Sequence, residues 1–109
     1  LAVNELRQLF EVMADLEALC ARYAARRMTP EERITLERLH EACAKEANQI
    51  EVEGYIKLNR RFHEVIYRGT HNAYLEEVTL AVRNKLSPYR RFQFNRPGRP
   101  PKSFEEHES

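Results

Sequence analysis

Apolar residues recur three and four positions apart along most of this sequence, and this spacing constrains the fold more strongly than any other feature. On an α-helix such residues line one side and form a core-facing stripe. Helix-breaking residues are scarce where the pattern runs, because the chain has only three Gly and five Pro, and four of the five Pro lie in its last quarter. No segment requires a β-strand, so we expect an all-α protein.

Capping signals divide the pattern into four main helices. The clearest signal is the stretch TPEE, in which Thr29 caps, Pro30 takes the first helical position and Glu32 completes a capping box. Pro88 is expected to end or kink the last of the four. The predicted ranges are 4–27, 30–48, 52–69 and 72–87, with Asn4 and Asn72 as caps and Gly69 as a stop.

The end of the chain predicts shorter elements. Residues 89–94 form a further helical piece, 95–102 form a loop rich in Pro, and Ser103 with Glu106 begins one more helix. We therefore predict a single domain over residues 1–109, an antiparallel helical bundle of about five to six helices. Its closing helix is expected to be missing, because the last piece is too short to bury a face. Ile34 and Val78 are expected to face the core.

Charge and composition narrow the partners. The net charge is +1, but residues 78–104 carry seven basic residues and no acidic ones, a block that attracts a carboxylate, a phosphate or a nucleic acid. No stretch approaches the roughly 18 apolar residues of a membrane span, so no membrane partner is expected. Cys20 and Cys43 fall on apolar helical positions and are expected to be buried thiols in a reducing cytoplasm, with a bridge between the first two helices as the alternative.

A polar pair interrupts the apolar stripe of the third predicted helix. With Tyr55 as the reference, Asn59 lies about 40° and His63 about 80° around the helix, since each residue advances by about 100°. Burying an amide without a partner costs about 1–3 kcal/mol. Two explanations stay open. One is a structural hydrogen bond to a tyrosine, a backbone group or water. The other is a divalent metal ion, because an amide oxygen and an imidazole four residues apart can reach one ion.

Further ligands would have to come from other helices. His107, in the last short piece, is the candidate third metal ligand. Arg83 flanks the apolar stripe of the fourth helix, where it would either direct its guanidinium inward to an anion or extend to solvent. His40 lies on a charged face and His71 in a turn, and both are expected to be exposed.

Four segments, in this order, resemble the FCD domain, the effector-binding C-terminal domain of GntR-type bacterial transcription regulators of the FadR-like branch. They are LFEVMADLEALCARYAA, TPEERITLERLHEA, YIKLNRRFHEVIYRGTHNAYLEEV and SFEEHES. The resemblance implies an all-α bundle that often holds zinc, nickel or manganese in a central cavity. It implies Asn59, His63 and His107 as metal ligands, and Arg83 as a residue that lines the effector cavity.

Two positions depart from the pattern of that family. Asn59 stands where Asp is commonest, and a neutral amide is a weaker metal ligand that leaves the site one negative charge poorer. Met13 stands where many relatives have an arginine on the first helix. The resemblance therefore implies a site with one anion contact fewer than in those relatives.

The resulting expectation is a cytoplasmic ligand-sensing domain and not an enzyme. A small carboxylate effector would bind at the metal and alter a homodimer, and this would change DNA binding through a winged-helix domain that would precede Leu1. The alternatives are a metal-free site for a hydrophobic acid, a metal-dependent helical-bundle enzyme, and a nucleic-acid-binding surface. The basic residues of that surface would be Arg90, Arg91, Arg96, Arg99 and Lys102. The enzyme is disfavoured because no Asp or Glu shares the face of Asn59 and His63 on the third helix.

Overall fold

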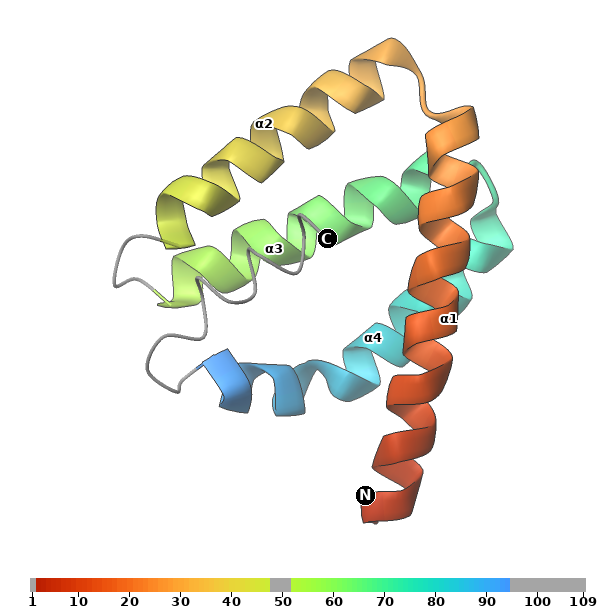
Figure 1. Cartoon of the computed structure of the whole chain (residues 1–109), viewed down its shortest axis with the longest axis vertical. Helices are drawn as coiled ribbons and strands as arrows, with labels where there is room; N and C mark the ends of the chain where they lie inside the picture. The colour runs from red at the N-terminus through yellow and green to blue at the C-terminus, as the bar shows by residue number, and fades with distance from the viewer. Residues whose placement is uncertain (1, 48–51, 95–109) are drawn as a thin grey trace.

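The computed structural model of this chain describes residues 2–47 and 52–94, which form a bundle of four α-helices. The helices are α1 (Val3–Arg27), α2 (Pro30–Ala47), α3 (Val52–Gly69) and α4 (Ala73–Phe94). α3 lies between α2 and α4, which both run antiparallel to it, and α1 crosses α3 and α4 (Figure 1). No strand occurs among the described residues, and the all-α prediction is confirmed.

The sequence predicted that Pro88 would either end or kink the fourth helix. The helix does not end there, because α4 continues through Pro88 to Phe94. A proline inside a helix removes one hydrogen bond, the one to the carbonyl four residues earlier, at Asn84. Asn84 and Pro88 are both exposed, so water can satisfy that carbonyl. Residues 89–94 therefore belong to α4, and the described part of the chain holds four helices instead of five to six. The predicted loop at 95–102 and capping box at Ser103 and Glu106 lie outside it.

The capping residues explain where two of the helices begin. Thr29 Oγ1 accepts a hydrogen bond from the Glu32 amide at 3.1 Å, and Glu32 Oε1 accepts one from the Thr29 amide at 2.8 Å, which confirms the capping box of α2. Asn72 Oδ1 accepts a bond from the Leu75 amide at 3.0 Å, and this confirms the cap of α4. The prediction of Asn4 as the cap of α1 is wrong, because that helix already includes it.

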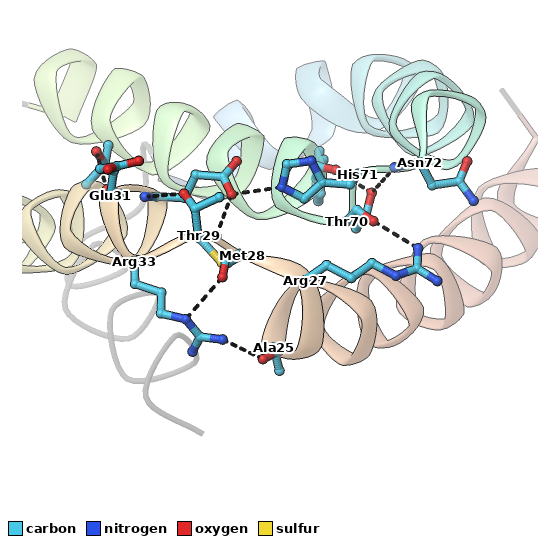
Figure 2. Close-up of polar contacts among 12 residues, drawn as sticks. Ala25, Arg27, Met28, Thr29, Glu31, Arg33, Thr70, His71 and Asn72 are labelled. Carbon is cyan, nitrogen blue, oxygen red and sulfur yellow. Dashed lines mark hydrogen bonds and ion pairs between the residues drawn. The ribbon is translucent and has the colours of Figure 1, made fainter.

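Two helix-connecting turns meet at one end of the bundle and are joined by polar contacts (Figure 2). Arg27 Nη1 donates a hydrogen bond to the Thr70 carbonyl at 2.9 Å, and His71 Nε2 lies 2.9 Å from Glu32 Oε1. His71 has a φ of 53°, a left-handed conformation that lets the chain reverse between α3 and α4. These contacts fix the turn between α1 and α2 against the turn between α3 and α4, and so hold α1 in place across the other helices.

Two apolar clusters fill the space between the helices. The first cluster lies between α1, α3 and α4, and its buried residues are Met13, Cys20, Tyr67, Leu75 and Leu86. The second lies between α2 and α3, and its buried residues are Leu39, Cys43, Tyr55 and Phe62. Both cysteines are buried and free, as predicted, and no bridge joins them. None of the described helices is long and apolar enough to cross a bilayer.

Ile34 and Val78 are exposed, so the prediction that they face the core is wrong. α2 packs mainly against α3, and therefore only a narrow stripe of it is buried. The buried side of α4 is centred on Thr79 and includes Arg83, which lies about 40° further around the helix, away from Val78. This rotation of α4 brings a charged residue into the bundle.

Candidate functional site

A row of polar residues runs along α3 at four-residue steps and consists of Asn59, His63 and Tyr67. One side of the helix carries all three, because four residues advance an α-helix by slightly more than one turn. Asn59 is 5 % exposed and Tyr67 is fully buried, whereas the His63 side chain is 17 % exposed. The bundle thus encloses the predicted pair, and Tyr67 extends the row by one turn.

α1 supplies a carboxylate, Glu17, to this row. Met13, four residues before it, and Cys20, three residues after it, are both buried, so the packing of α1 turns Glu17 inward. Its Oε1 accepts a hydrogen bond from the Tyr67 hydroxyl, and its Oε2 lies 3.5 Å from His63 Nδ1. The crossing of α1 over α3 is therefore joined by a polar contact inside the bundle.

α4 completes the site with Arg83, which is 7 % exposed. Its Nη1 lies 3.3 Å from Glu17 Oε1 and 3.3 Å from the Tyr67 hydroxyl oxygen. Of the two predicted placements for this arginine, inward and extended to solvent, the structure has the inward one. The anion that it meets is Glu17. We call Glu17, His63, Tyr67 and Arg83 the polar cluster.

Electrostatics favour an ionised Glu17 and a neutral Tyr67. Burial raises the pKa of Glu17, but the hydrogen bonds and charges of His63, Tyr67 and Arg83 outweigh this effect and bring the pKa from 4.5 down to about 2. Burial raises the pKa of Tyr67 well above its ordinary value, an effect that the Arg83 charge opposes and the Glu17 charge reinforces. The cluster is therefore one carboxylate surrounded by hydrogen-bond donors.

Asn59 differs from the polar cluster because its side-chain oxygen has no hydrogen-bond partner among the described residues. A buried acceptor left in this state costs about 1–3 kcal/mol. One explanation for this amide was a structural hydrogen bond to a tyrosine or a backbone group. No such group in the described part of the chain donates to the Asn59 oxygen. The oxygen is a suitable donor atom for a divalent cation, and His63 lies one turn further along the helix.

Within residues 2–47 and 52–94, no group of three His, Cys, Asp or Glu side chains is arranged to hold a metal ion. His107, the predicted third ligand, lies outside these residues. The other two candidates suit a divalent ion in their chemistry. Asn59 offers a buried oxygen. An imidazole that donates its Nδ1 proton to a carboxylate, as His63 can to Glu17, presents Nε2 as its metal-binding atom.

The other residues singled out from the sequence lie away from this site. His71 is exposed at the turn between α3 and α4, as predicted. His40 is only partly exposed, contrary to the prediction, because its ring packs against Phe62 with centroids 5.7 Å apart. The structure does not describe the side chains of the alternative nucleic-acid-binding residues, which are Arg90, Arg91, Arg96, Arg99 and Lys102.

Sequence reasoning missed Glu17 and Tyr67. Tyr67 lies four residues after His63, so extending the polar row by one turn would have found it. Glu17 lies on the apolar side of the first predicted helix, between Met13 and Cys20, and an acidic residue in such a position is the signal. The third helix carries no carboxylate on the face of Asn59 and His63, and α1 supplies one in Glu17.

Comparison with protein families agrees with this architecture. The family model of the FCD domain matches residues 8–109, nearly the whole chain. This chain belongs to the FCD domain family. FCD domains are effector-binding regulatory domains of GntR-type regulators, so this FCD domain is a regulatory module and its partner is a small-molecule effector. No curated protein and no solved structure matches the chain.

Proposed function

We propose that this FCD domain binds a small carboxylate effector beside a divalent metal ion at the centre of the bundle. The main support is the buried Asn59 oxygen, which has no partner among the described residues and lies one helical turn before His63. An apolar side chain would pack at this position without the cost of an unsatisfied amide oxygen. Local rules of packing are commonly broken at functional sites, and a bound ion would satisfy the oxygen.

The ion would be held by Asn59, His63 and His107, and the family implies zinc, nickel or manganese. When bound, it supplies positive charge and a coordination position for an acid oxygen. Glu17 would orient the His63 ring by accepting the Nδ1 proton, since these atoms lie 3.5 Å apart. Asn59 would contribute an oxygen atom without adding negative charge.

Arg83 is the residue that we assign to the effector itself. Its guanidinium is buried, and its planar set of donors matches a carboxylate. In the intact homodimeric regulator, the effector would bind one arrangement of the dimer better than the other and so change the spacing of two winged-helix DNA-binding domains. Contact with DNA would belong to those domains.

Calorimetric titration of the EDTA-treated domain with Zn²⁺ and with Ni²⁺ tests the metal. We expect His63→Ala to weaken binding about tenfold or more. The control is His71→Ala, at an exposed histidine on a turn away from the site, which we expect to leave the affinity unchanged. Equal affinity in the wild type and His63→Ala would remove the metal from the proposal.

A metal-free site for a hydrophobic acid is the second candidate. The buried Arg83 favours it, because a guanidinium can bind a carboxylate without a metal. An acid that raises the melting temperature of the EDTA-treated wild type, but not that of Arg83→Gln, would support this candidate. An acid that acts only after Zn²⁺ is added would support the first.

A further inference from the structure

Glu17 receives polar contacts from two other helices, and these are contacts that a small acid would use. The Tyr67 hydroxyl donates to Oε1, Arg83 Nη1 lies 3.3 Å from the same oxygen, and His63 Nδ1 lies 3.5 Å from Oε2. Guanidinium, phenol and imidazole groups around one carboxylate form a receptor for that group. In this structure the receptor is filled by a residue of its own chain.

The position of this carboxylate allows exchange with a solute. The Glu17 side chain is 26 % exposed, whereas Tyr67 and Arg83 are buried. Glu17 is therefore the member of this trio that solvent reaches most, and we expect an external acid to reach the cluster there. In the described part of the chain, Arg83 is in ion-pair contact with no carboxylate besides Glu17. An acid that takes the Nη1 donor of this guanidinium competes with that residue.

We propose that Glu17 is an internal competitor for the effector, whose carboxylate replaces that of Glu17 on Arg83 and Tyr67. This inference rests on the proposed function, in which a small acid is the effector. It makes Glu17 a specificity-determining residue, because a ligand must offer an equivalent carboxylate to take over both donors. Neutral ligands of the same size leave Glu17 in place.

The exchange also connects ligand binding to the position of a helix. Glu17 links α1 to His63 on α3 by a polar contact and to Arg83 on α4 by an ion pair. When an acid takes the donors, α1 loses this link, while its apolar contacts at Met13 and Cys20 remain. A ligand that binds the arrangement without the link shifts the population toward that arrangement.

Chemical rescue with acetate tests the receptor with a defined probe. Glu17→Ala removes the atoms of one acetate ion, Cγ and the carboxylate, and leaves Arg83 and Tyr67 beside the gap. The melting temperature of the EDTA-treated domain is measured in sodium acetate and in sodium chloride at equal ionic strength. We expect acetate to raise the melting temperature of Glu17→Ala by about 4 °C or more beyond chloride. Glu11→Ala, at an exposed position of α1, and the wild type are expected to show no such rise.

Two further variants keep the test decisive. Arg83→Gln in the Glu17→Ala background is expected to abolish the acetate response. If Glu17→Ala does not fold in chloride, recovery of its helical circular dichroism with acetate replaces melting, and Glu17→Gln serves as the second variant. Its amide is a weaker acceptor that acetate displaces, so a smaller rise is expected. If neither variant responds more than Glu11→Ala, the contact is a structural ion pair only and the proposal is overturned.

The Zn²⁺ titration of the wild type decides the proposed metal site separately. Acetate rescue without metal binding would keep the internal competitor and remove the metal. Metal binding without acetate rescue would keep the metal site and remove the competitor. The two failures are therefore distinguishable.

Discussion

The stability of a Glu17→Gln variant measures how strongly the polar cluster depends on its one carboxylate. The change keeps the size of the side chain but leaves Arg83, 7 % exposed, without its ion-pair partner. A pKa lowered from 4.5 to about 2 corresponds to about 3 kcal/mol in favour of the ionised carboxylate in the folded state, at about 1.4 kcal/mol per pKa unit. Removing one partner of a buried ion pair costs about 3–5 kcal/mol. We therefore expect Glu17→Gln to lower the free energy of unfolding by about 3 kcal/mol.

Urea unfolding at neutral pH with EDTA present, followed by circular dichroism, measures this loss. Glu11→Gln, at an exposed position of the same helix, is the matched control and is expected to stay within about 0.5 kcal/mol of the wild type. The Glu17→Gln/Arg83→Gln double variant should lose less than the sum of the single losses by about 1 kcal/mol or more, because the second change removes the charge that the first leaves unpaired. Additive losses, or a Glu17→Gln variant as stable as Glu11→Gln, would refute the reasoning.

The same free energy depends on pH in a defined direction. Because the folded-state pKa of Glu17 lies below its ordinary value, its contribution is complete above about pH 4.5 and is lost as the pH falls through about 2. The wild type is therefore expected to lose about 3 kcal/mol more than Glu17→Gln on acidification from about pH 5 to about pH 2. Parallel stability curves for the two proteins would contradict the depressed pKa.

Three further substitutions test the packing and the candidate metal ligand. Gly69→Ala places a Cβ atom 2.6 Å from Met28 Cγ. We expect it to lower the free energy of unfolding by about 1–3 kcal/mol, and by less in a Met28→Ala background; an unchanged stability would contradict the close approach. Thr29→Ala removes the cap of α2 and is expected to lower the free energy of unfolding by about 1 kcal/mol. Thr35→Ala, on the exposed side of the same helix, is the control and is expected to cause no such loss. Equal melting temperatures for the two variants would show that the cap contributes nothing. Asn59→Leu removes an amide oxygen that has no partner among the described residues, and is expected to stabilise the metal-free domain by about 1 kcal/mol in urea unfolding. A destabilised variant would show a structural hydrogen bond at this residue.

Helix boundaries could be predicted because their signals are local. The capping box of Thr29 and Glu32 and the Asn72 cap act within four residues of sequence, and the structure has both. Pro88 shows where local signals fail. Whether a proline ends a helix depends on whether the carbonyl that it leaves free can reach water, and this is decided by the exposure of that part of α4.

The candidate site could be predicted only where one helix carries the information. The spacing of Asn59 and His63 on α3 sufficed to place both on one side of that helix. Glu17 joins them because α1 crosses α3, a contact between segments far apart in the sequence. For Arg83, sequence spacing gives the angle of the residue on α4 but not the rotation of α4 within the bundle. An inward and a solvent-facing arginine were therefore both possible, and the burial of Thr79 and its neighbours decides for the inward one.

The charge balance of the site is compatible with the proposed binding of an acid, even though the residue at position 59 is neutral. Glu17 already provides one carboxylate, and Arg83 cancels its charge. An aspartate at position 59, as many relatives have by the resemblance, would add a second negative charge that repels an incoming acid. The amide of Asn59 offers an oxygen to a metal ion without that charge. In the proposed function, the attraction for an acid would come from the ion, or from Arg83 once the effector had displaced Glu17, and the neutral amide would oppose neither.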